Sequence, residues 1–282
     1  MSTLRVDVGR SPIASEHHRL MRTALARGEL VPEIEPGATL EGDYAPESIR
    51  IARAAWLERM RHEHHSSAVF ARLLPQLVRA EASLEYKTVA LRMAMDELRH
   101  AALCAGVVRL LGGEPELEVS LETEALPEHA GESARVCALR NVMFVSCLSE
   151  TIATTLLAEE RELTREPHIR RVEEQLAADE VLHGRFGWAY AKEVFPQLDA
   201  DERASMERYL PLALGSIEAK MLAAMPLGAE PPARIEDELA ALGVTTSARG
   251  RELLALVLED VIVPALSELG LDAEAAWRAR RA

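Results

Sequence analysis

The sequence has few cysteines, no excess of basic residues and no long uninterrupted hydrophobic run. Its three cysteines, Cys104, Cys137 and Cys147, show no Cys-x-x-Cys spacing, which favours buried thiols in a reducing compartment over a disulfide framework. The net charge of −14 argues against nucleic acid or an anionic membrane surface as a general partner. The N-terminus lacks the apolar core of a signal peptide, and charges interrupt the most apolar segments. We therefore expect no membrane span and a cytoplasmic location.

The hydrophobic pattern predicts an all-α protein with no convincing β-strand. Apolar residues recur at steps of three and four in several long segments, which is the pattern of helices with one buried face. We expect an N-terminal arm at 1–45 with a short helical stretch at 16–27, a four-helix bundle at 46–196, and a C-terminal helical extension at 197–282 that packs on the bundle. Within the bundle, turns near Ala80 and Arg165 close two hairpins, and an acidic stretch at about 112–132 connects them.

Capping and breaking residues give approximate ends for these helices. Ser83 is placed to begin the second helix, and Glu166-Pro167 to begin the fourth. The expected helices lie at about 46–79, 84–111, 133–164, 167–195, 200–225 and 249–269. Pro264 is expected to kink or end the last of them.

Two short motifs carry the chemistry. Asp96-Glu97-Leu98-Arg99-His100 and Asp179-Glu180-Val181-Leu182-His183 share the form Asp-Glu-x-x-His, and they contain the only Glu-x-x-His spacings in the sequence. Residues three apart lie on one face of a helix, so each motif offers a carboxylate and an imidazole to the same point. One such pair in a glutamate-rich chain means little, because most would be solvated surface pairs.

The helix register adds one glutamate to each motif. Glu63 and Glu97 both lie 17 residues from the turn near Ala80, and Glu150 and Glu180 both lie 15 residues from Arg165. With a rise of about 1.5 Å per residue, the two glutamates of each hairpin meet at one level. The neighbours of Glu150 are mostly apolar, so its carboxylate is expected to be buried, where an unpaired glutamate is unusual.

Four carboxylates buried together need cations to balance their negative charge. Two divalent ions would cancel the charges of the four glutamates, whereas without them the acids would take up protons. Hard carboxylate oxygens with one imidazole per ion favour iron or manganese, and the lack of cysteine ligands disfavours structural zinc. The expected metal ligands are Glu63, Glu97, His100, Glu150, Glu180 and His183.

This pattern closely resembles the ferritin-like di-iron superfamily, in which two helices each supply a Glu and two others each supply a Glu-x-x-His. The resemblance covers roughly residues 46–196, including the long connection that this fold needs. It implies two iron ions, with manganese or a mixed pair left open. It also implies that Glu97 and Glu180 bridge the metals, that Glu63 and Glu150 bind one each, and that Asp96 and Asp179 orient the histidines from behind.

Departures from the sub-patterns of the superfamily narrow the activity that the resemblance implies. A rubrerythrin-like protein would carry a Cys-x-x-Cys module, and the radical-generating ribonucleotide reductase subunit a tyrosine where this chain has Cys104. Relatives of the arylamine N-oxygenases have a histidine at the position of Leu176. A tRNA-hydroxylating relative would need a basic face, which the net charge of −14 disfavours. An oxidase or oxygenase that uses O₂ on a small organic or lipid-like substrate remains, with an electron donor and a homodimer left open.

Around the centre, several other side chains are candidates for lining a substrate channel beside Glu63 and Glu150. The candidates are Ser67, Cys104, Cys147, Thr151, Thr154 and Tyr190, although buried core packing is an ordinary role for the cysteines and the tyrosine. Two alternatives to the oxygenase stay open. One is an iron-oxidising, ferritin-like storage protein. Such proteins assemble into cages, and the roughly 80 residues after the fourth helix would be hard to accommodate in one. The other is a non-catalytic helical protein that binds metal for stability.

Overall fold

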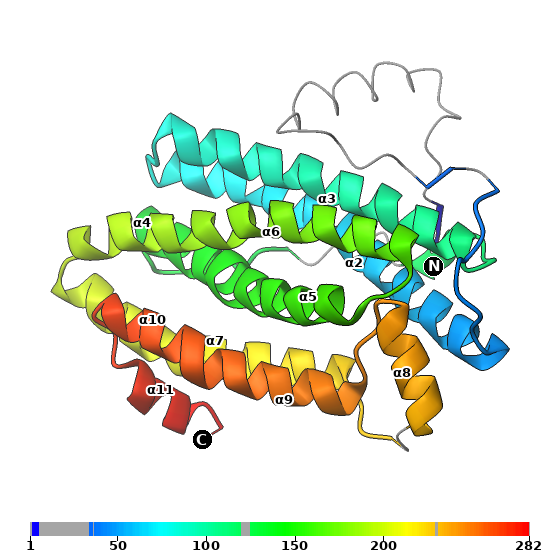
Figure 1. Ribbon diagram of the computed structural model, residues 1–282. Helices are drawn as coiled ribbons and strands as arrows, with labels where there is room; N and C mark the ends of the chain where they lie inside the picture. Colours follow the sequence, from blue (N-terminus) through cyan, green and yellow to red (C-terminus); the bar gives the residue numbers. More distant parts are fainter. Residues whose placement is uncertain (1, 6–33, 36, 120–124, 229–230, 282) are drawn as a thin grey trace, which may run out of the picture.

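The computed structural model describes residues 2–5, 34–35, 37–119, 125–228 and 231–281 (Figure 1). Over these residues the chain is mostly helical, so the all-α class is confirmed in its coarse form. The helical stretch predicted at 16–27 lies outside the described residues.

The first hairpin consists of α2 (Pro46–Arg79) and α3 (Leu84–Leu110), which pack against each other along their length. Proline in the first turn of α2 suits a helix start, because its fixed φ is helical and its missing N–H has no partner there anyway. Helix α3 begins directly after Ser83, as predicted, although the serine hydroxyl makes no capping hydrogen bond. The four residues between the helices close the turn, with Glu81 at a φ of 55°.

The second hairpin consists of one long helical segment and α6 (Pro167–Val194). The segment runs through α4 (Ala134–Val142), a π-helix, η1 (Met143–Glu150), and α5 (Thr151–Leu163). Its predicted extent, 133–164, is confirmed, and the side chain of Ser133 caps it by accepting the amide of Val136 at 3.2 Å. The sequence did not predict the π-helix, whose wider turns place Glu150 at the junction with α5.

A two-stranded antiparallel sheet corrects the expectation that the chain has no strand. Strand β1 (Ser2–Arg5) pairs with β2 (Glu116–Val119), which lies in the predicted long connection. The segment Glu-Leu-Glu-Val does alternate charged and apolar residues. However, four residues are too few for a period-two pattern to stand out, and the partner strand is far away in the sequence.

The C-terminal part contains more elements than the two helices predicted. After the short 3₁₀ turn η2 (Phe195–Gln197), the described elements are α7 (Ala200–Ala224), α8 (Ala233–Ala241), α9 (Ser247–Val257), the π-helix η3 (Leu258–Ile262), α10 (Val263–Glu268) and α11 (Ala273–Ala279). Pro264 is the second residue after the π-helix η3 and lies within a continuous helical path from Ser247 to Glu268, so it does not end the helix. Helices α8 and α11 are short, which weakens their sequence signal.

Tertiary contacts tie the C-terminal part to the four long segments. Helix α7 packs on α4 and η1, and α9 packs on α5 (Figure 1). Helix α8 fastens the start of α2, because Glu238 accepts hydrogen bonds from the amide of Ala45 at 2.8 Å and the hydroxyl of Ser48 at 2.7 Å. Glu166 similarly accepts the amides of Glu41 and Gly42. The boundaries proposed at residues 45 and 196 stay predictions.

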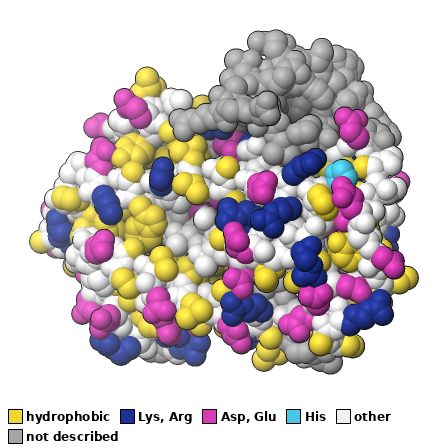
Figure 2. Space-filling model, viewed as in Figure 1, with side chains coloured by type: hydrophobic (Ala, Val, Ile, Leu, Met, Phe, Trp, Pro, Cys, Tyr) yellow, Lys and Arg dark blue, Asp and Glu magenta, His cyan; other side chains and the backbone are white. Residues whose placement is uncertain are grey.

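The face of the molecule that Figure 2 shows combines interspersed charges with an apolar area. Lys and Arg side chains alternate with Asp and Glu, and hydrophobic side chains gather mainly on the left half, while α3 and α6 cross the upper part of the same view in Figure 1. Exposed Leu84, Leu91 and Leu98 of α3 and Val181 of α6 belong to these two helices.

One described helical segment, Ala134–Leu163, is long and apolar enough to cross a membrane by length and composition, contrary to the expectation from its charges. Half of its most apolar window is buried inside the protein. A core helix of a water-soluble protein passes the same test, so the segment does not decide for or against a membrane. The cytoplasmic location stays a prediction.

Candidate metal centre

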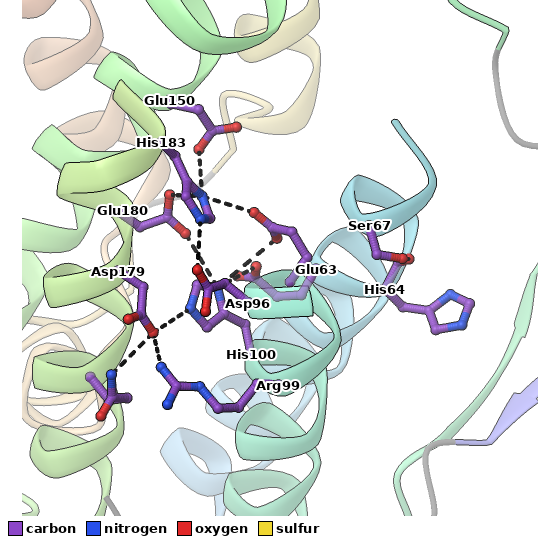
Figure 3. Close-up of polar contacts among 12 residues, drawn as sticks. Glu63, His64, Ser67, Asp96, Arg99, His100, Glu150, Asp179, Glu180 and His183 are labelled. Atoms are coloured by element: carbon purple, nitrogen blue, oxygen red, sulfur yellow. Dashed lines mark hydrogen bonds and ion pairs between the residues drawn. The ribbon is translucent and has the colours of Figure 1, made fainter. Parts of the chain in front are cut away.

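Six side chains from four helical segments converge in the interior (Figure 3). Their ligand atoms form two groups, within each of which all atoms lie within 4.8 Å of one another, and both groups contain Glu97 and Glu180. The first group is completed by Glu63 and His100, and the second by Glu150 and His183. The structure therefore brings together all six residues that the sequence predicted as ligands.

Helix geometry explains this convergence. Glu97 and His100 face inward from α3, and Glu180 and His183 face inward from α6, because residues three apart share a helix face. All residues between Glu150 and the turn at Arg165 are in regular α5, so the register argument from the sequence holds there despite the π-helix before it. Tight packing of α6 on η1 fixes the remaining side of the centre.

Gly187 makes that packing possible. A Cβ at this position would lie 2.6 Å from the Cβ of Ser146 and 2.8 Å from the backbone nitrogen of Cys147. These distances are far below any normal carbon contact, so α6 approaches the π-helix at a spot where only glycine fits. The close approach lies one turn after His183 and one turn before Glu150.

Both histidines turn the same ring nitrogen toward the carboxylates. Nδ1 of His100 lies 3.4 Å from Glu63 and 3.3 Å from Glu180. Nδ1 of His183 lies 3.1 Å from Glu97 and 3.0 Å from Glu180. Neither Nδ1 atom has a hydrogen-bond partner, although both are buried. Buried ring nitrogens without a partner, aimed at carboxylates, form a donor set that could hold a metal ion.

The two aspartates lie behind the histidines, and each aspartate faces the histidine of the other Asp-Glu-x-x-His motif. Oδ2 of Asp179 lies 3.1 Å from Nε2 of His100, and Asp96 lies 3.7 Å from Nε2 of His183. The first contact is a hydrogen bond, and the second is an ion-pair distance. A carboxylate behind a ligand histidine fixes the ring and its tautomer, which is the role expected for Asp96 and Asp179.

Arginines hold the aspartates in turn, and the sequence alone did not single them out. Arg92 donates from Nε to both carboxylate oxygens of Asp96 at 2.9 Å, and Arg99 forms a short ion pair with Asp179. Gln175 also donates to Asp179, at 3.1 Å. Arg92 and Gln175 each stand four residues before their aspartate, a helix-neighbour spacing that could have revealed them.

Without cations the centre shares protons among its acids and bases. Burial and the neighbouring glutamates raise the pKa of Glu97 and Glu150 well above its ordinary value. Burial also works against ionisation of Glu180, but the two histidines outweigh it and hold the pKa of that carboxyl well below its usual range. For His100 and His183 burial lowers the pKa, and the surrounding carboxylates more than reverse this and raise it well above normal. Divalent cations would replace these protons.

Exposure differs between the two sides of the centre. The side chains of Glu63 and Glu150 are 15% and 11% exposed, whereas those of both histidines are fully buried. Glu63 of α2 and Glu150 at the end of η1 are therefore the more exposed of the six side chains. The substrate channel that the sequence placed beside these two residues stays a prediction.

The candidate channel residues differ in their surroundings. Cys104 is buried, and the electrostatic field of Glu63 and Glu97 acts on its thiol, so it lies near the centre. Thr151 accepts a hydrogen bond from the indole of Trp188 at 3.1 Å, and Thr154 donates to the carbonyl of Glu150. The hydroxyl of Ser67 donates to the carbonyl of His64, and both residues lie to the side of α2 away from the cluster (Figure 3).

The other two candidates are core residues. Cys147 is fully buried in the π-helix beside Gly187, where burial raises the pKa of its thiol. The ring of Tyr190 packs edge-on against Tyr86 at 5.1 Å, two turns beyond His183, and its hydroxyl has no hydrogen-bond partner. The ring of Phe70 packs beside the centre, with its centroid 5.4 Å from that of His183.

Comparisons with family models, with curated proteins and with solved structures found no match to this chain. Its chemistry is therefore interpreted from the geometry of the centre.

Proposed function

We propose that the chain is a ferritin-like protein whose Glu₄His₂ centre holds two iron ions and uses O₂ to oxidise a small organic or lipid-like substrate. The observation that carries this proposal is the division of six clustered ligand groups, most of them buried, into two sets of four that share Glu97 and Glu180. Two sets with two common carboxylates are the arrangement of a pair of bridged ions. The four long helical segments and the connection at about 112–132 agree with a ferritin-like bundle.

Charge favours a pair of ions over one. Four glutamates carry four negative charges when ionised, and two divalent cations neutralise them, whereas one would leave an excess charge in a buried site. The oxygen-rich donor set with one imidazole for each ion favours iron, and also accepts manganese. When bound, such ions supply the electrons and the Lewis acidity that O₂ chemistry needs.

The side chains around the ions divide the remaining work. Glu97 and Glu180 would hold both ions, while Asp179 keeps the Nε2 side of His100 occupied so that Nδ1 faces inward. The fully buried histidines close one side against water. Glu63 and Glu150 form the accessible side, where a substrate would approach and where a carboxylate can shift to admit it.

Controlled iron oxidation tests this proposal against its two alternatives. Anaerobic protein is loaded with two ferrous ions per chain or with a large excess, and is then mixed with O₂. The oxygenase predicts fast oxidation that stops at the bound pair until a reductant is added. Continued oxidation of the excess to a dissolved mineral would instead establish an iron-storage protein.

A third outcome would contradict catalysis altogether. If bound ferrous iron reacts with O₂ no faster than iron in buffer, the centre is structural. The matched control is Glu162→Ala, an exposed glutamate on α5, beside the double variant Glu97→Ala, Glu180→Ala. Only the double variant should lose the fast phase.

A further inference from the structure

A second group of polar side chains, the second polar layer, lies one to two helical turns along the sequence from the residues of the metal centre. Arg59 of α2 is one turn from Glu63, Cys104 of α3 is one turn from His100, and Glu173 of α6 is two turns from Glu180. Helix α5 contributes Glu160, which forms an ion pair with Arg59 at 2.5 Å. Three helices that supply the centre thus also supply this layer.

Glu173 is the unusual member of the layer. Its side chain is fully buried, and neither carboxylate oxygen has a hydrogen-bond partner. The nearby hydroxyl of Thr164 donates instead to the backbone carbonyl of Glu160, at 2.9 Å. A buried carboxylate with no partner is strongly disfavoured, whereas the neutral acid avoids that cost.

The backbone packs directly against this carboxyl group. Oε1 of Glu173 contacts Gly243 so closely that a side chain there would collide with it, and Gly243 has a φ of +72°. Trp56 holds the same loop by donating its indole N–H to the carbonyl of Leu242 at 2.9 Å. The surroundings therefore fix the position of Glu173, while the nearby Thr164 hydroxyl makes its hydrogen bond to the carbonyl of Glu160.

The charges that face Glu173 do not compensate a second carboxylate. From α2 the guanidinium of Arg59 is its main attraction, but that charge is paired with Glu160 of α5, which repels Glu173. Arg170 of α6 adds a weaker attraction, and the thiol of Cys104 on α3 also lies within range. Burial outweighs the two arginines and the nearby Thr164 hydroxyl, which favour the carboxylate, and it raises the pKa of Glu173 to about 7.

We propose that Glu173 is a buried carboxylic acid that stores a proton beside the Arg59–Glu160 ion pair and supplies it to O₂ chemistry at the metal centre. This inference rests on the proposed function, because reduction of O₂ to water consumes a proton for each electron. In the step, the O–H bond of Glu173 breaks, its electron pair stays on the carboxylate, and the proton forms a new O–H bond on an oxygen atom of the O₂ that is being reduced by ferrous iron and substrate. The positive charge of Arg59 offsets part of the new negative charge. Solvent replaces the proton at the edge of Arg59, whose side chain is 23% exposed.

The first test observes the proton itself. In iron-loaded protein, the infrared spectrum of wild type at pH 6 should contain the carbonyl stretch of a protonated carboxylic acid that shifts in D₂O. The band should be absent in Glu173→Gln and present in Glu174→Gln, a control on the exposed neighbour. A band that is identical in Glu173→Gln would overturn the proposal.

The second test follows the reaction. The rate of O₂-dependent oxidation of two ferrous ions per chain should fall in wild type as pH rises through about 7, since Glu173 then loses its proton. Glu173→Gln should be slower by roughly tenfold or more at pH 6, with no inflection, at unchanged iron content. A profile that matches wild type would overturn the proton-supply role. Failure of the proposed function would differ, because wild type and Glu174→Gln would then both fail to oxidise iron.

Discussion

Oδ2 of Asp179, in the second Asp-Glu-x-x-His motif, lies 3.1 Å from Nε2 of His100 in the first. Each motif thus supplies the aspartate that stands behind the histidine of the other, since Asp96 faces His183. The exchange links α3 to α6 at the level of the centre, and it leaves Nδ1 of each ring directed at the carboxylates.

Removing the charge of Asp179 should weaken metal binding without unfolding the protein. In Asp179→Asn the side chain keeps its size but no longer holds His100 as a carboxylate does, so metal affinity should fall by roughly 10- to 100-fold. Titration with manganese, followed by calorimetry, measures this. Asp237→Asn, on an exposed ion pair, is the control, and equal affinities in the two variants would contradict the role of Asp179.

Metal binding should release protons and should strengthen as pH rises. In the metal-free protein the pKa values of Glu97, Glu150, His100 and His183 are raised, so these groups carry protons that a cation must displace. Manganese affinity should therefore increase from pH 6 to pH 8. Calorimetry in buffers of different ionisation enthalpy counts the released protons. Proton uptake on binding would contradict this assignment.

Alanine substitutions at two glycines of α6 test the contact of this helix with the π-helix η1. Gly187→Ala forces a methyl group into Ser146 and Cys147, so it should destabilise the fold by about 1–3 kcal/mol. Gly184→Ala meets no other atom within 4 Å, so the helix preference of alanine should stabilise it by about 0.5–1 kcal/mol. Urea unfolding measures both. Destabilisation of equal size would show that α6 does not approach η1 as described.

The protonated state of Glu173 predicts a pH-dependent stability. Its pKa is raised from 4.5 to about 7 in the folded chain, so ionisation opposes folding increasingly as pH rises from about 4.5 to 7 and fully above 7. Glu173→Gln removes this cost. Relative to wild type, the variant should gain up to about 3 kcal/mol between pH 5 and pH 8. Chemical unfolding at both pH values measures the change, and a difference that does not vary with pH would contradict it.

Local patterns in the sequence predicted the long helices and all six clustered residues, because helix periodicity, Pro167 and the Glu-x-x-His spacing each act over a few residues. The features that escaped prediction depend on contacts between distant segments. The pairing of β1 with β2 joins the two ends of a long stretch, and the π-helix responds to packing around Gly187. The sequence did not single out Glu173, because its lack of a partner depends on the pairing of Arg59 with Glu160, which lies on another helix.

Metal stoichiometry is the most direct test of the two-ion centre. Protein expressed with iron and freed of loosely bound metal should contain close to two metal ions per chain by elemental analysis, and a lower melting temperature after chelation. The variant Glu97→Ala, Glu180→Ala, which removes both shared carboxylates, should lose both ions, while Glu162→Ala should keep them. Well under two ions per wild-type chain, or a double variant that matches wild type in metal content and melting temperature, would contradict the di-metal centre.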